Sequence, residues 1–143
     1  MNLRLLRRDP DRSWLLVFDH GDRVVEGLLS FAEEQGVAGA RLWGIGALEH
    51  VELGFYRAER RDYDRFTFQE ELELLSLHGN LGVTDEGPRV HTHVVVGRSD
   101  GTAHGGHLFE GRVGPTLELF VTEAPVEIRR EMDEGFGLPL IRL

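Results

Sequence analysis

The fold is decided by residues 89–112, RVHTHVVVGRSDGTAHGGHLFEGR, in which two strand-like segments, 89–97 and 105–112, flank a short polar loop. Ser99-Asp100-Gly101 suits a three-residue hairpin loop, a type I turn followed by glycine in the left-handed conformation. In that register Arg98 pairs with Thr102. The stretch is therefore predicted to be an antiparallel hairpin, and it favours a fold based on a sheet.

Three of the seven histidines fall on one face of this hairpin. The two-residue period of a strand places His91 and His93 on the same face, with Cα atoms roughly 6.5–7 Å apart. The predicted register sets His107 directly opposite His93, and it sends His104 to the other face. A two-residue loop at Asp100-Gly101 would move His107 to the other face, and a bulge at 105–106 could either restore or disrupt the grouping.

Three imidazoles on adjacent strands suit a divalent metal, with zinc the first expectation among the borderline first-row ions. One coordination position would stay open for water or a carboxylate. The predicted metal ligands are therefore His91, His93 and His107.

A carboxylate for such a site is predicted from the next part of the chain. If Val113-Gly114 forms a two-residue loop, Phe109 pairs with Glu118, and Glu118 points to the face of the histidines. Glu118 is thus the candidate catalytic residue, either orienting an imidazole or acting as general base on a metal-bound water. An ordinary exposed glutamate is the alternative.

The remaining pattern predicts one helix among many short strands. Asp22 is expected as its N-cap and Gly36 as its C-cap, with apolar side chains at helical spacing between them. A turn is expected at Asp9-Pro10-Asp11. Further strands are expected over 3–8, 13–19, 39–46, 51–56, 66–69, 71–78, 116–122 and 140–143, with 127–133 ambiguous between helix and strand. The fold class is therefore α+β, a mostly antiparallel sheet with one main helix, in a single domain over 1–143.

Composition excludes several classes of protein and site. The chain of 143 residues has no cysteine and no lysine, so disulfides, thiolate metal sites and Schiff-base chemistry are absent. No apolar run exceeds Trp14–Phe18, so a membrane span is excluded, and a cytoplasmic location is expected because the first residues do not resemble a signal peptide. The net charge of −9 opposes nonspecific attraction to nucleic acid, and the arginine pairs, Arg129–Arg130 among them, are interpreted as solvated surface.

Several blocks together resemble the PPC domain, the plant- and prokaryote-conserved domain. The blocks are Glu73–Asn80, His91-Thr92-His93, Asp100-Gly101, Gly105–Leu108 and Thr116–Glu118. The resemblance implies a curved antiparallel sheet with one main helix and assembly as a homotrimer. It also implies a metal site in some prokaryotic members, at the positions of His91, His93 and His107.

In plants the PPC domain follows an AT-hook, which binds DNA, whereas the prokaryotic domain usually stands alone. This chain has no Arg-Gly-Arg-Pro core and hence no AT-hook. Three functions follow as hypotheses. The first is a homotrimeric zinc-like metal-binding domain; the alternatives are a DNA-associated regulatory interaction module and a metal-dependent hydrolase or lyase of unknown substrate.

Overall fold

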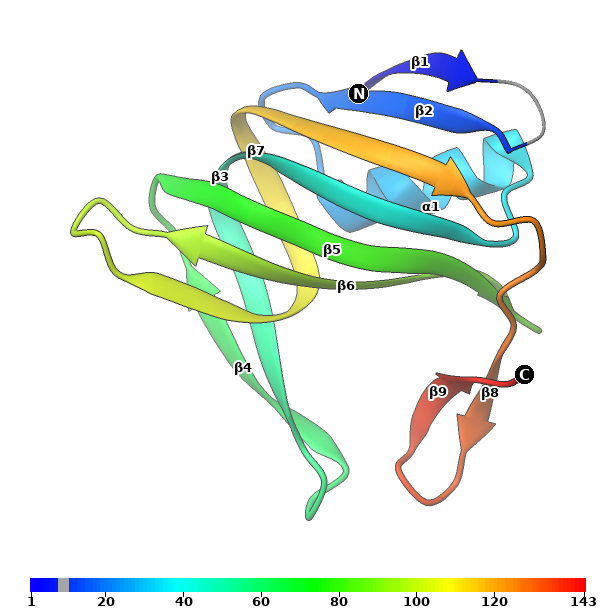
Figure 1. The fold of residues 1–143 in the computed structure, drawn as a ribbon. Helices are drawn as coiled ribbons and strands as arrows, with labels where there is room; N and C mark the ends of the chain where they lie inside the picture. The colour runs from blue at the N-terminus through cyan, green and yellow to red at the C-terminus, as the bar shows by residue number, and fades with distance from the viewer. Residues whose placement is uncertain (8–10) are drawn as a thin grey trace.

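The computed structural model describes residues 1–7 and 11–143 of the chain. Within that part the strands and the helix follow one another as β1 (Asn2–Arg7), β2 (Ser13–Phe18), α1 (Val24–Gln35), β3 (Ala40–Arg57), β4 (Asp62–Phe68), β5 (Leu72–Thr84), β6 (Gly87–Gly97), β7 (Ala103–Glu123), β8 (Arg130–Asp133) and β9 (Leu138–Ile141). The predicted α+β class is confirmed (Figure 1). None of the described helical residues forms a segment long and apolar enough to cross a membrane.

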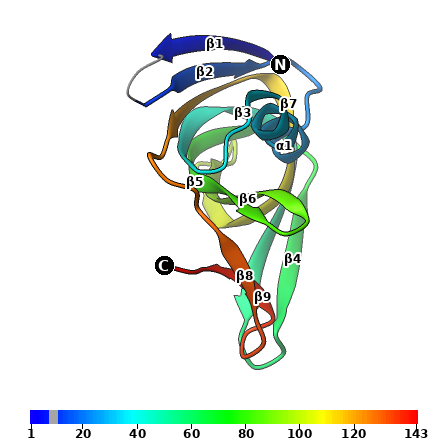
Figure 2. The same cartoon turned by 90° about the vertical axis from the view of Figure 1, so that its right-hand side faces the viewer.

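The main sheet is antiparallel and strongly curved. Its strand order is β1-β2-β7-β6-β5-β3-β4, and β7 pairs with β3 as well. This additional pairing closes β7, β6, β5 and β3 into a ring, which Figure 2 shows from one end with α1 beside it. Strands β8 and β9 form a separate hairpin that extends away from the sheet beside the β4 end (Figure 1).

The core lies on the concave side of the sheet, under the helix. Strand alternation buries one side chain in two, as in β2, where Trp14, Leu16 and Phe18 are all buried. Helix α1 buries Phe31, whose ring meets Trp14 edge-on at 5.2 Å between centroids. The helix contacts β6 and β7, so these two strands are covered on their inner face.

The helix begins differently from the prediction. Asp22 is not its N-cap: the Asp22 carboxylate accepts a hydrogen bond from the Asp19 amide, and Arg23 is the N-cap residue without a side-chain cap bond. Glu110 of β7 accepts from the Val25 amide at 2.9 Å instead, so a carboxylate distant in sequence stabilises the free amides of the first turn. The C-cap prediction is confirmed, because Gly36 adopts a left-handed φ of 63°.

Several strands are longer than predicted. The segments predicted at 39–46 and 51–56 belong to one strand, β3, and those at 105–112 and 116–122 belong to one strand, β7. The predicted hairpin at Val113-Gly114 was therefore wrong. Strand β7 does not turn there because β3 runs beside it from Ala40 to Gly54 and supplies ladder partners on both sides of this point.

The C-terminal region settles the ambiguous segment. Residues 127–133 contain the strand β8, which pairs with β9. Strand β9 begins and ends two residues before the last strand predicted, at 140–143. The turn predicted at Asp9-Pro10-Asp11 falls mostly outside the described residues.

Candidate metal centre

The hairpin that carries the histidines has the predicted register. His93 pairs with His107 and Val96 pairs with His104. The loop closes with the Arg98 amide donating to the Thr102 carbonyl at 2.8 Å, and Gly101 has a φ of 80°. The three-residue loop is thus confirmed, and the two-residue alternative is excluded.

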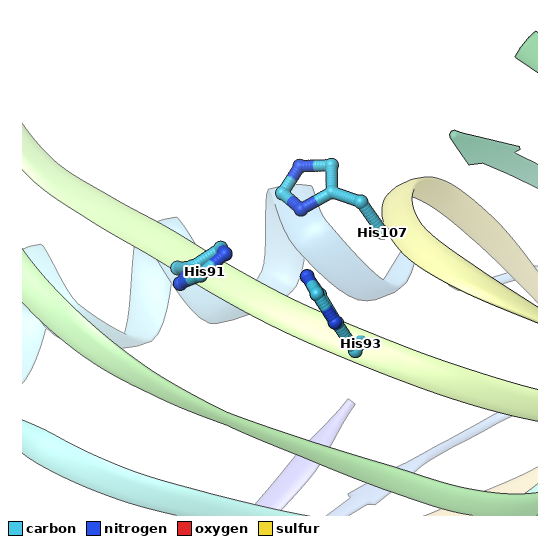
Figure 3. Close-up of side chains that lie close together, drawn as sticks. All are labelled: His91, His93 and His107. Carbon is cyan, nitrogen blue, oxygen red and sulfur yellow. The ribbon is translucent and has the colours of Figure 1, made fainter. Parts of the chain in front are cut away.

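The three predicted ligands converge on one space. Their ring centroids are 5.1 Å apart for His91 and His93, 5.4 Å for His91 and His107, and 5.6 Å for His93 and His107. One ring nitrogen from each lies within 4.8 Å of the other two. Figure 3 shows the rings of β6 and β7 turned toward a common centre.

The sheet approaches closely behind these residues. Gly79 of β5 pairs with Thr92, the residue between the two histidines of β6. A Cβ at Gly79 would lie 2.1 Å from the His91 carbonyl oxygen, so β5 and β6 come together at a distance that only glycine permits. The backbone of the His91–His93 segment is therefore packed closely against β5.

Aromatic side chains border the site at His107. Tyr63 of β4 and Phe109 of β7 lie 5.2 Å and 5.1 Å from the His107 ring, measured between centroids. The same two rings meet edge-on at 5.1 Å. These rings help to bury His107, which is half-buried, as is His91, while His93 stays exposed.

Burial keeps two of the imidazoles neutral. Burial, with the nearby His91 and His93, lowers the pKa of His107 to about 4. Burial followed by the charge of Arg130 also lowers the pKa of His91. A neutral imidazole offers the lone pair that a metal ion requires, so the unprotonated form is ready for coordination near neutral pH.

His107 also has an unsatisfied polar atom. Its Nδ1 is buried and has no hydrogen-bond partner. A buried nitrogen without a partner costs free energy, and native structures avoid it unless another ligand takes its place. The nitrogen separations and the imidazole donor set fit a divalent ion after small side-chain rotations, since zinc–nitrogen bonds are about 2.0–2.1 Å.

Arg130 lies against this cluster, contrary to the prediction that it is a surface residue. Its side chain is only 6% exposed, although the Arg129–Arg130 pair was interpreted as surface. Arg129 is a surface residue, with an ion pair to Asp85, whereas Arg130 donates to the Asn80 side chain at 2.8 Å and to His91 Nδ1 at 3.2 Å. The alternation of a strand is the one signal that separates these two neighbours.

Two other predicted residues lie away from the cluster. His104 points elsewhere, as predicted, and packs 4.8 Å from Phe68 between ring centroids. Glu118 is exposed, eleven residues beyond His107 on the same strand, and pairs with Val17 and Ile45 rather than with Phe109. In the described part of the chain no carboxylate joins the three histidines, so the geometry that suggested Glu118 as a base is not present.

Comparison with known proteins gives a family match and a set of similar structures. The family model of the Plants and Prokaryotes Conserved (PCC) domain matches residues 7–125. No curated protein matches the chain in sequence.

Three solved structures illustrate the similarity. A plant- and prokaryote-conserved protein from Pyrococcus horikoshii is 30% identical over 99% of this chain and 95% of its own, with a TM-score of 0.86. A metal-containing protein from Archaeoglobus fulgidus is 34% identical over 99% and 97% of the two chains, with a TM-score of 0.85. A protein from Bacteroides thetaiotaomicron, named as a proposed DNA-binding protein, is 27% identical over 98% and 96%, with a TM-score of 0.88.

Proposed function

The chain belongs to the Plants and Prokaryotes Conserved domain family, and from this membership and its histidine cluster we propose that it is a metal-binding domain. His91, His93 and His107 hold one divalent ion, most consistent with zinc. The observation that carries the proposal is the convergence of three ring nitrogens within 4.8 Å from two paired strands.

Chemistry supports zinc over harder ions. Imidazole is a borderline ligand that suits zinc and other first-row ions, whereas magnesium and calcium prefer oxygen ligands. In the described part of the chain, these three histidines form the one group of side chains close enough together to hold a metal ion. Three protein ligands leave one position open, which is the arrangement of sites that bind a further small molecule.

Metal content tests the proposal directly. Protein purified without a histidine tag is expected to carry about one zinc ion per chain by elemental analysis. His93→Ala is expected to weaken zinc binding by more than about 100-fold, since loss of an outer-sphere partner alone costs 10–100-fold. His104→Ala is the matched control, because it removes a histidine of the same hairpin that faces away. Folded wild-type protein that binds no zinc in a chelator competition would overturn the proposal.

The chain is further proposed to form a homotrimer, as the family resemblance implies. Large apolar side chains on the outer sheet face support self-association, because Trp43, Ile45, Leu75 and Val95 are all exposed. Light scattering is expected to give a mass three times the chain mass of 16.2 kDa. A monomer at all concentrations would contradict this part of the proposal.

A DNA-associated role is the second candidate function, favoured by the name of the Bacteroides relative. The net charge of −9 opposes it, because affinity for DNA comes chiefly from neutralised phosphates. We expect no retardation of a duplex oligonucleotide in a gel-shift titration at physiological salt. Retardation that high salt abolishes would favour this second function.

A further inference from the structure

A small cavity adjoins the histidines and is lined by positive charge. It has a volume of about 120 Å³, and its polar lining comes from Tyr63, Arg89, His91, His107 and Arg130. No aspartate or glutamate lines it. Apolar side chains of Phe109 and the β9 hairpin strand complete the wall.

The two arginines of this cavity differ from most other arginines in the described part of the chain. Among the described residues, neither Arg89 nor Arg130 has a carboxylate within ion-pair distance, although the chain holds 25 acidic residues against 16 arginines. Arg130 is 94% buried, since its exposed fraction is 6%. A buried charge without a counter-ion is costly, and proteins compensate it by pairing or by binding a ligand of opposite charge.

The hydrogen bonds of Arg130 all go to neutral acceptors. Its Nη atoms donate to the Pro139 carbonyl at 3.0 Å, to Asn80 Oδ1 at 2.8 Å and to His91 Nδ1 at 3.2 Å. The Nε atom is buried and has no partner. The guanidinium is therefore held in place, but its charge is not neutralised and its donors are not all used.

The contact with His91 cannot persist when that ring binds an ion. A neutral imidazole has one nitrogen with a lone pair and one with a proton, and coordination uses the lone pair. The remaining ring nitrogen then carries the proton and cannot accept from Arg130, which is itself always a donor. Metal binding at His91 thus removes one acceptor from a guanidinium that already lacks one for Nε.

We propose that this cavity binds a small oxyanion, such as a carboxylate of few atoms, between Arg89, Arg130 and the metal site. The anion supplies the acceptor that His91 gives up and the negative charge that the cavity lacks. The small volume selects for a free anion of this size rather than for a nucleic acid or a protein segment. This inference rests on the metal-binding function proposed above and specifies the ligand class of the same site.

Cobalt-loaded protein provides the test. Co²⁺ takes the place of zinc and has a visible absorption spectrum that reports its ligands, so binding of an anion is read without any assumed activity. Acetate and inorganic phosphate are titrated in separate arms at constant ionic strength. We expect a saturable spectral change, with the arm that saturates at lower concentration identifying a carboxylate or a phosphate as the preferred oxyanion.

Arginine variants locate the response. Arg89→Gln is expected to weaken anion binding by about 10-fold, the effect of losing one charge-assisted hydrogen bond, and Arg130→Gln by at least as much. Arg89 is exposed, so its variant is expected to fold even if the buried Arg130 proves necessary for stability. Arg4→Gln on β1, whose side chain does not line the cavity, is the matched control and is expected to leave the titration unchanged.

The outcomes separate the two proposals. A wild-type protein that takes up no cobalt overturns the metal-binding function and this inference with it. A cobalt spectrum that neither anion changes overturns the inference alone, and so does an Arg89→Gln titration that matches the Arg4→Gln titration.

Discussion

Alternate residues of β6 and β7 meet two different environments on the two faces of the sheet. On the inner face Val94, Val96 and Leu108 are buried in the apolar core under the helix. On the outer face His91, His93 and His107 lie among an arginine, two aromatic rings and solvent. A shift of one residue in register would move the buried side chains to the outer face and the histidines to the core. Burial of the inner face therefore fixes the register that places the histidines outside.

The two faces also differ in their contribution to stability. Burial of apolar side chains stabilises the inner face by about 1.5–3 kcal/mol for each large residue. The outer face instead contains a buried His107 nitrogen and a buried Arg130 nitrogen that have no partners. Core packing on the inner face thus supports a polar cluster whose buried, unpartnered nitrogens do not stabilise the metal-free fold.

A change in the length of the hairpin loop is expected to have the largest effect, because it alters which residues of β6 and β7 face the core and which face outward. Deletion of Ser99 leaves a two-residue loop, which shifts the pairing of β6 with β7 by one residue. Leu108 and His107 would then exchange faces. We expect zinc affinity to fall by more than about 100-fold and most of the folding stability to be lost, as measured by chelator competition and urea unfolding.

Ser99→Ala keeps the loop length and serves as the control for this deletion. It is expected to bind zinc as the wild type does. A deletion variant that retains both stability and zinc would mean that a bulge restores the register, and that the loop does not control the site.

Single truncations on the two faces separate packing from binding. Leu108→Ala removes a core side chain and is expected to lower the free energy of unfolding by about 2–5 kcal/mol. His107→Ala, one residue away on the outer face, is expected to change the unfolding free energy of the metal-free protein by less than about 1 kcal/mol, because it also removes an unsatisfied nitrogen.

Urea unfolding in the presence of a chelator measures both variants, and zinc titration is the second readout. Leu108→Ala is expected to bind zinc wherever it remains folded, whereas His107→Ala is not. Equal destabilisation by the two substitutions would show that the histidine face contributes to core stability after all.

The sequence was sufficient to predict those features that depend on local chemistry. The loop at Ser99-Asp100-Gly101 contains its own turn signal, so the pairing of His93 with His107 followed from a few residues. The helix end at Gly36 and the single-helix α+β class were predicted for the same reason. The grouping of His91, His93 and His107 was predictable because all three lie on one hairpin.

Features that depend on distant partners were not predictable from local patterns. Strand β7 continues through Val113-Gly114 because β3, some sixty residues earlier, pairs with it, and this displaced Glu118 from its predicted position. The carboxylate of Glu110 accepts from the amide of Glu26, 84 residues earlier in the sequence, and so caps the start of the helix. The sequence predicted a local cap at Asp22 instead. Arg130 approaches the histidines through the β8–β9 hairpin, which no pattern in residues 89–112 reveals.

The pH dependence of the stability of the metal-free protein is expected to show a smaller effect, which arises from the burial of His107 on the outer face. The pKa of His107 is lowered to about 4 by burial and then by His91, His93, Arg89 and Arg130, against about 6.5 in the unfolded chain. Between these values the unfolded chain takes up a proton at His107 that the folded protein does not, so the stability of the metal-free protein is unaffected by this group above about pH 6.5 and declines as the pH falls toward 4.

We expect the urea midpoint of the metal-free wild-type protein to decrease as the pH is lowered from about 7 to about 5. The midpoint of His107→Ala is expected to decrease less over the same range. His107→Ala keeps His91, whose pKa is lowered in the same direction, so part of the response should remain. An identical pH dependence in the two proteins would mean that His107 is not held neutral by the fold.

The smallest expected effect concerns Glu110, which links β7 to the helix that covers the inner face. Its carboxylate accepts from the amides of Val25 and Glu26, so Glu110→Ala is expected to cost about 1 kcal/mol of unfolding free energy, as loss of a helix cap does. Glu26→Ala removes only an exposed ion pair with Arg23 and is expected to cost a few tenths of a kcal/mol at most. Both variants should bind zinc with wild-type affinity, because neither moves the register of β6 with β7. A loss of zinc in Glu110→Ala would show instead that the helix contact, and not the ladder alone, positions His107.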